Sequence, residues 1–136
     1  MRFILLMIPA VYQGGRGNRV GADFTPPADA VERMSKFNEA LVKAGALISL
    51  DGLHPIEKGA RVTFSDSTPH VIEGASLDNT EVVGGYWMIQ CQSKREAIEW
   101  AKRIPAEKGD VIEIRQMQEL SDFPEDVQKA ASALSL

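Results

Sequence analysis

Apolar residues occur along the chain in two rhythms, one typical of buried strands and the other of amphipathic helices. Residues 2–8 are apolar on both alternating faces, so they predict a strand that is buried on both sides. Residues 82–91 form the second long strand, with Gly84-Gly85 near its start. Shorter strands are predicted at 46–50, 61–64, 70–72 and 111–117. The strands on either side of the turn at 65–69 form a hairpin.

A first amphipathic helix is predicted after Pro26-Pro27. Asp29 followed by Glu32 is an Asp version of the capping box that begins helices. Gly45 is the expected glycine just past the end of this helix. Apolar residues at spacings of three and four form its buried stripe, which consists of Ala30, Met34, Phe37, Leu41 and Ala44.

Two more helices are predicted in the second half of the chain. Ser93 followed by Glu96 is a capping box, and Pro105 stops the helix that it begins. A short helix at 124–134, begun by Ser121 or Asp122, is an appendage at the C-terminus. The Gly-rich stretch 12–25 and the polar stretch 77–80 are loops.

The predicted order of elements is strand, helix, strand, hairpin, strand, helix, strand, helix. This order indicates an α+β protein with a ferredoxin-like split βαβ sheet and an inserted hairpin. Two helices cover one face of such a sheet, and apolar side chains remain on the other face. The strand at 82–91 contributes to that face either Tyr86 and Met88 or Trp87 and Ile89. A second copy is the simplest cover, so we expect a homodimer packed sheet to sheet.

The composition narrows the class of protein. The chain has 136 residues, 44% apolar and 25% charged, as expected for a single globular domain over 1–136. A net charge of −4 argues against nucleic acid as a partner, because phosphate binding needs a basic face. The apolar run behind Arg2 is too short for a signal peptide or a membrane span. With a single cysteine, Cys91, these features predict a cytoplasmic protein without a membrane partner.

Sequence blocks spread over nearly the whole chain resemble the YCII-related family, in the branch named for an Asp-Gly-Pro-Phe signature. Besides the first strand, the blocks lie in order at 37–39, 51–55, 58–62, 82–89, 96–100 and 112–115. The resemblance implies a ferredoxin-like α+β domain that pairs into a dimeric α+β barrel. This implied fold agrees with the pattern of strands and helices.

The chain departs from this family in two places. The signature falls at 73–76, where only Gly74 is kept, and the loss of Pro and Phe removes a rigid turn and an aromatic side chain. Compact relatives carry a suspected catalytic pair, a His on the first helix and an Asp before a Pro after the second. Met34 and Ile104 stand in those places here, so the His–Asp chemistry does not carry over.

His54 is the candidate catalytic residue. It follows the predicted turn at Asp51-Gly52, and histidine titrates near neutral pH, which suits proton transfer. Asp51, three residues earlier, is the group expected to orient it. The alternative is a turn histidine that bonds to backbone and has no chemical role. His70, beside Pro69 on a short strand, is expected to be idle.

Charged residues on the strands are the candidate ligand-binding residues. Arg61 and Arg115 are suited to grip a carboxylate through two parallel hydrogen bonds. Glu81 and Glu113 are expected near them, and ordinary salt bridges across the strands are the alternative. Tyr86 and Trp87 point to opposite faces, so only one of them can line a cleft; Tyr86 is the candidate, and packing in the core is the alternative for both.

The remaining motifs point to no cofactor. Gly15-Arg16-Gly17 begins like a dinucleotide loop, but Val20 replaces the third glycine. Two histidines and one cysteine lack the spacing of a metal site, so we expect no metal. Gly84-Gly85 indicates either a β-bulge or the close approach of a ligand, with the bulge favoured. Cys91 is expected to be a buried, inert thiol.

Three functions follow from these observations. The favoured one is binding of a small metabolite, an anion among the candidates, in a cleft beside the sheet, with acid/base catalysis by His54. The second is a non-catalytic binding or regulatory module; the resemblance allows it, since some relatives are joined to sigma-factor-like regions. The third is an accessory protein whose C-terminal helix docks a partner.

Overall fold

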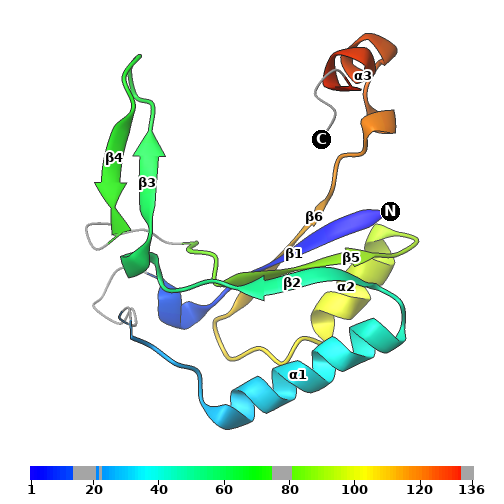
Figure 1. The fold of residues 1–136 in the computed structure, drawn as a ribbon. Coiled ribbons are helices and arrows are strands. Elements are labelled where there is room, and N and C mark those ends of the chain that lie inside the picture. Colours follow the sequence, from blue (N-terminus) through cyan, green and yellow to red (C-terminus); the bar gives the residue numbers. More distant parts are fainter. Residues whose placement is uncertain (14–20, 22, 75–80, 133–136) are drawn as a thin grey trace.

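The computed structural model describes residues 1–13, 21, 23–74 and 81–132, and it is built on an antiparallel sheet that two helices cover on one face (Figure 1). The strands are β1 (Arg2–Ile8), β2 (Leu47–Gly52), β3 (Ala60–Thr63), β4 (His70–Glu73), β5 (Gly85–Gln90) and β6 (Val111–Gln116). The helices are α1 (Ala28–Lys43), α2 (Lys94–Lys102) and α3 (Glu125–Ser132), and the 3₁₀ turns are η1 (Ala10–Tyr12), η2 (Ile56–Lys58) and η4 (Leu120–Asp122). The predicted α+β class is confirmed.

The four-stranded sheet has the order β2-β5-β1-β6, and each neighbouring pair is antiparallel. β3 and β4 pair with each other instead, in a two-stranded sheet of their own that is the predicted hairpin. The Gly15-Arg16-Gly17 motif and the loop at 77–80 lie outside the described residues. Within the described part of the chain, no helix has the length and apolar character needed to span a membrane.

The core lies between the sheet and the two helices α1 and α2. Phe3 of β1 stands opposite Ile89 of β5, and Leu5 stands opposite Trp87; all four side chains are buried. Phe37 of α1 packs edge-on against Trp87, with ring centroids 5.8 Å apart. The Trp87 indole Nε1 donates a 2.8 Å hydrogen bond to Asn38 Oδ1, so its polar group is satisfied inside the core. Trp87 therefore faces the helices, and Tyr86 faces the other side.

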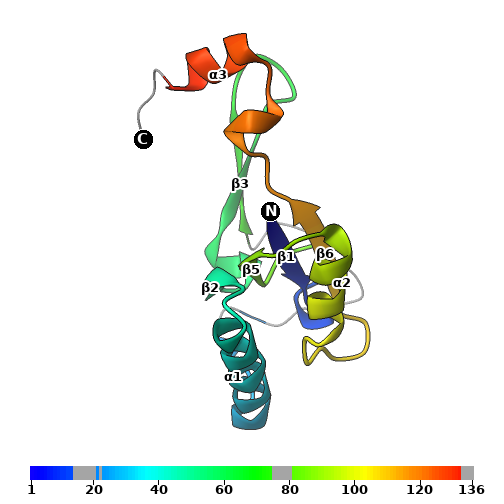
Figure 2. The same cartoon turned by 90° about the vertical axis from the view of Figure 1, so that its right-hand side faces the viewer.

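The opposite face of the sheet has no helix of the described chain upon it (Figure 2). We name it the open face; Ile4 stands on it between Met88 and Arg115, and Leu6 stands between Tyr86 and Glu113. The uncharged side chains at its centre are only partly buried: Ile4, Leu6, Tyr86 and Met88. The predicted uncovered apolar surface is therefore present.

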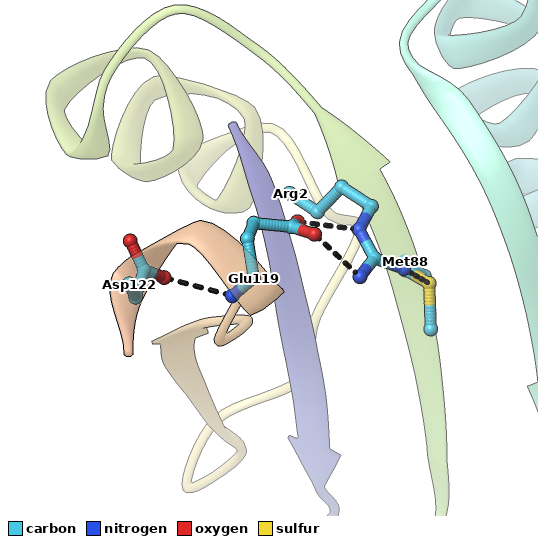
Figure 3. A network of polar contacts seen from close by, with 4 residues as sticks. All are labelled: Arg2, Met88, Glu119 and Asp122. Atoms are coloured by element: carbon cyan, nitrogen blue, oxygen red, sulfur yellow. Dashed lines mark hydrogen bonds and ion pairs between the residues drawn. The ribbon is translucent and has the colours of Figure 1, made fainter. Parts of the chain in front are cut away.

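Two segments stand away from the sheet on the side of the open face (Figures 1 and 2). The hairpin arm consists of residues 60–73 and the C-terminal arm of residues 117–132. Arg2 anchors the base of the C-terminal arm: its Nε and Nη2 donate to the two carboxylate oxygens of Glu119 at 2.6 and 3.0 Å (Figure 3). This pairing lowers the pKa of the Glu119 carboxyl.

Capping residues in the sequence predicted some of the helix ends correctly. Glu96 N donates to Ser93 Oγ at 3.2 Å, which confirms Ser93 as the N-cap of α2. Gly45 follows α1 with a φ of 70°, a conformation that favours glycine, as predicted for the residue past a helix end. The C-terminal helix is confirmed, but it begins at Glu125. Asp122 lies in η4 instead and accepts from the N–H of Glu119, the N-cap of that turn.

The predicted capping box at Asp29 is wrong. Pro27 is the last extended residue before α1, with φ −60° and ψ 149°, so Ala28 is already helical and Asp29 lies inside the first turn. The Asp29 carboxylate instead accepts a 2.8 Å bond from Arg33 Nη1, and this bond lowers the pKa of Asp29. A carboxylate in the first turn of a helix also interacts favourably with the helix dipole.

The predicted turn at Asp51-Gly52 and the predicted bulge at Gly84-Gly85 are also wrong. Asp51 and Gly52 belong to β2 and stand opposite Tyr86 and Gly85. A Cβ on Gly85 would lie 3.0 Å from Asp51 O, so glycine allows these strands to approach. The register of the sheet shifts in β2, between Leu47 and Ser49, whereas β5 pairs with β1 without interruption.

Gly74, the glycine at the expected signature position, closes the base of the hairpin arm. It is buried, its N–H donates to Gly59 O at 2.8 Å, and a Cβ would lie 1.7 Å from Ile56 O. Only a residue without a side chain fits against this carbonyl. Gly74 is therefore required by packing alone, whatever residues follow it in the sequence.

We expect Gly74→Ala to loosen the base of the hairpin arm, since overpacking against backbone costs about 1–3 kcal/mol. Amide hydrogen exchange of residues 60–73 should accelerate about tenfold or more. Gly52→Ala is the control, because a Cβ there meets no atom within 4 Å. Equal exchange rates in the two variants would contradict the close approach at Gly74.

We also expect the C-terminal arm to detach in acid. Glu119 has a lower pKa in the folded protein than in the unfolded chain, so its pairing with Arg2 stabilises the arm above the unfolded pKa of about 4.3. The stabilisation is lost as the pH falls through the lowered folded-state pKa. NMR relaxation of residues 120–132 should show this release in the wild type, and Glu119→Gln should show a mobile arm already at neutral pH. Glu125→Gln, which removes an exposed carboxylate within α3, should behave like the wild type.

Candidate functional site

Two adjoining cavities lie beside η1, near the end of β1. The larger has a volume of about 570 Å³ and the smaller about 350 Å³. They share four wall residues, Tyr12, Phe24, Pro26 and Gly84. A hollow of about 520 Å³ on the outer side of α1 is lined by Ser35, Asn38, Glu39, Val42 and Lys43, which all belong to that helix, so no second element closes it.

Tyr12 forms the wall between the two cavities. Its side chain is buried, its hydroxyl donates to Leu53 O at 3.2 Å, and its ring meets Phe24 edge-on at 6.1 Å. Burial raises the pKa of the Tyr12 hydroxyl, which keeps it protonated as a hydrogen-bond donor at neutral pH. The wall is thus fixed at both ends of the tyrosine side chain.

Gln13 ties η1 to the segment before β5. Its Nε2 donates to Pro9 O at 2.6 Å and to Val82 O at 3.0 Å, and its Oε1 accepts from Val82 N at 2.7 Å. The amide thereby pairs with both backbone groups of Val82, as a neighbouring strand would do. We call this set of three bonds the Gln13 clip.

Gly84 lets this segment lie against η1. A Cβ there would stand 2.6 Å from Pro9 Cγ and 3.2 Å from Tyr12 Cδ2. Its backbone bonds in both directions, from Gly84 N to Met7 O at 2.8 Å and from Leu53 N to Gly84 O at 2.9 Å. The glycine pair therefore marks the close approach of the protein's own backbone, and it helps to shape both cavities.

The larger cavity has an apolar wall and a charged rim. Met7 and Met34 add to the apolar wall, and the rim carries Asp29, Arg33, Glu107, Lys108 and Asp110. Arg33 donates to Asp29 and, through Nη2, to Glu107 Oε1 at 3.2 Å. Asp110 accepts from Ala10 N and from Glu107 N, both at 2.8 Å. With three carboxylates and two cations, the rim does not form an anion grip.

His54 lines the smaller cavity, and its side chain is exposed. The structure brings Asp51 together with Tyr86 rather than with His54. The Tyr86 hydroxyl donates to Asp51 Oδ2 at 3.0 Å on the open face, opposite the helices. This pairing results from the extra length of β2: Asp51 is still a strand residue, whereas His54 lies beyond the strand end.

The other predicted ligand-binding residues lie elsewhere. Glu113 and Arg115 form an exposed pair on β6, with Arg115 Nη1 3.3 Å from Glu113 Oε2. Arg61 is exposed on the hairpin arm, and Glu81, exposed, precedes Val82 with a φ of 62°. None of these four residues lines either cavity. The predicted group is thus divided among the cavities, the open face and the hairpin arm.

Sequence reasoning missed the residues that build the cavities. Tyr12 and Gln13 lie in a stretch whose glycines predict a loop, and Phe24 is an isolated aromatic residue near its end. A usable signal is an aromatic residue and an amide directly after the strand-ending Pro9. Among the described residues no three His, Cys, Asp or Glu side chains gather in a way that could hold a metal ion.

Cys91 agrees with the predicted inert thiol. It is buried, its Sγ lies 3.4 Å from Ser93 O, and burial raises the pKa of the thiol. A raised pKa keeps the sulfur protonated at neutral pH, and the thiol is far less nucleophilic than the thiolate.

We expect Gln13→Glu to open the wall between the cavities. The change has the same shape, but it replaces the donor Nε2 with an oxygen that faces two carbonyl oxygens, which costs about 1–3 kcal/mol of stability. Urea unfolding should detect the loss at neutral pH, and the loss should shrink in acid, where the introduced carboxyl group is protonated and donates again. Gln116→Glu, the same change at an exposed position of β6, should leave the stability nearly unchanged.

Comparison with known proteins shows the family to which the chain belongs. The family model of the YCII-related domain matches residues 7–121, which is most of the chain. The match spans the end of β1, both core helices, the hairpin arm and most of η4. No curated protein matches the chain. Because the matched region includes most of the four-stranded sheet and every residue of the two cavities, the chain belongs to the YCII-related family.

Proposed function

We propose that the protein binds a small, largely apolar molecule in the two adjoining cavities, with His54 as the group that exchanges a proton with it. The observation that carries this proposal is that Tyr12, Phe24, Pro26 and Gly84 line both cavities, so that an apolar cavity directly adjoins the one lined by His54. Both volumes fall in the range of about 300–1,000 Å³ that is usual for ligand pockets.

The charge of the rim favours a neutral or cationic molecule. The three carboxylates around the larger cavity outnumber its two cations, and Arg33 already pairs with Asp29 and Glu107. Arg61 and Arg115 were the reason to expect an anionic ligand. Neither of them lines a cavity, so they offer no positive charge to an anion there. We therefore expect one ionisable group of the ligand at His54 and the apolar body of the ligand beside Tyr12.

Binding without catalysis is the second candidate function. His54 has no carboxylate partner from Asp51, which bonds to Tyr86, so Asp51 does not orient its imidazole. Met34, at the place of the suspected family histidine, lines the larger cavity, and Ile104, at the place of the aspartate, is buried. These apolar side chains favour a binding role, as in a regulatory module, if His54 proves dispensable.

We further propose that the domain is ferredoxin-like and pairs into a dimeric α+β barrel. The order β2-β5-β1-β6, with α1 after β1 and α2 after β5, supports the first part. The apolar open face supports the second, because a second copy would cover Ile4, Leu6 and Met88. The cytoplasmic location stays a prediction from the single cysteine.

Thermal shift against a panel of amines, neutral aromatic compounds, carboxylic acids and phosphate esters tests the binding site. A ligand that binds the folded protein raises its free energy of unfolding by mass action, by about 2.7 kcal/mol at a ligand concentration of 100 times the Kd. The melting temperature rises as a result. We expect His54→Gln to weaken the shift about tenfold or more in apparent Kd. His70→Gln is the matched control, because His70 lies on the hairpin arm beside Asp66.

The outcomes separate the candidate functions. A ligand that shifts both histidine variants as it shifts the wild type would refute a role for His54 and leave the binding role. If no compound shifts the wild type, the proposal of a small-molecule site in these cavities fails.

A further inference from the structure

The hairpin arm lacks the support that such an element needs. Among the described residues β3 and β4 pair with each other and not with the four-stranded sheet. Their apolar side chains face water: Val62 is 50% exposed, Val71 66% and Phe64 72%. An isolated two-stranded hairpin is marginally stable in water and needs a third strand or a packed surface. The arm therefore needs to pack on a surface that lies outside the described part of this chain.

The C-terminal arm shows the same lack of support. α3 has eight residues, and isolated helices shorter than about 12–15 residues are marginal in water. Its main packing partner is the short turn η4, and Leu120 and Val127 remain 47% and 41% exposed. The pairing of Arg2 with Glu119 fixes the base of the arm but not the helix beyond it (Figure 3).

The two arms flank the same surface. Both rise from the sheet on the side of the open face, at opposite ends of it in Figure 1, and the second view shows the same direction (Figure 2). Any body that covers the open face must lie between them. The open face and both arms thus form one continuous surface without a partner in the described chain.

The chain exposes more surface than a compact monomer of its mass. The chain exposes 9437 Å², whereas a compact monomer of 14.9 kDa exposes about 7,000 Å². The difference, about 2,400 Å², is of the size that one partner buries in a large obligate dimer, where the total is about 2,000–5,000 Å².

We propose that the hairpin arm and the C-terminal arm clasp a second copy of this chain, each packing its apolar side chains on the flank of the partner. The proposal rests on the sheet-to-sheet dimer proposed above and adds the arms to its interface. A second copy fits because a two-fold axis would set the apolar centre of the open face against the same apolar centre of the partner. Such an axis also gives each copy two arms and two flanks to receive them.

Three substitutions to Asp, studied by light scattering and analytical ultracentrifugation, test the clasp in the full chain. Phe64→Asp alters the hairpin arm, and Leu6→Asp alters the open face. Val42→Asp alters α1 on the helical side, where the side chain is 61% exposed, and serves as the matched control. We expect a wild-type dimer, at least about a tenfold higher dimer Kd for Phe64→Asp, and a Kd within about twofold of the wild type for the control.

Photo-crosslinking gives a second readout that does not depend on affinity. With p-benzoylphenylalanine in place of Phe64, irradiation should produce a covalent dimer, and the same group in place of Val42 should not. Circular dichroism of each variant checks that the fold is kept.

The outcomes separate the clasp from the dimer on which it rests. A monomeric wild type overturns both the dimer and the clasp. This outcome includes the case in which the arms bind a different protein instead of a second copy. If Leu6→Asp dissociates the dimer while Phe64→Asp leaves the Kd unchanged and position 64 gives no crosslink, the dimer stands and the clasp is overturned. Neither result depends on ligand binding in the cavities, which thermal shift tests separately.

Discussion

The central strand β1 is apolar on both faces, while the helices of the described chain cover only one of them. This mismatch is the constraint on which the rest of the structure depends. On the covered side, Phe3 and Leu5 meet the aromatic cluster around Trp87, and this contact holds α1 and α2 on the sheet. On the other side, Ile4 and Leu6 lie at the centre of the open face. The same strand thus builds the core and supplies the apolar centre of the open face, which the proposed dimer would cover.

The cavities and the open face belong to different parts of the molecule. The cavities form where β1 ends and the chain enters η1, held by the Gln13 clip. The open face lies over the middle of the strands. The proposed binding of a small molecule and the proposed association of two copies would therefore use separate sets of side chains, although both depend on the position of β1. A change in one set leaves the other largely intact.

Much of the fold could be predicted from the sequence, because the elements follow from hydrophobic period and from local capping. Ser93 and Gly45 act within a few residues of chain, and their roles were readable. The site was less readable, because it depends on strand length. Two extra strand residues place Asp51 on the open face beside Tyr86, away from His54. Spacing in the sequence cannot show this, since the direction of a side chain alternates with each strand residue.

Gly74 has a consequence for how proteins of this plan can diverge. Its backbone lies close to Ile56 O of η2 and donates to Gly59 O, and beyond these contacts β3 and β4 pair with each other. Lengthening a surface loop adds little entropic cost, about 0.6 kcal/mol for each doubling. The arm can therefore grow, shrink or change its tip during evolution while the sheet and the cavities keep their geometry. In the proposed roles, the arm would set the choice of partner and the cavities the choice of ligand, and an engineer can graft a new recognition hairpin between η2 and Gly74.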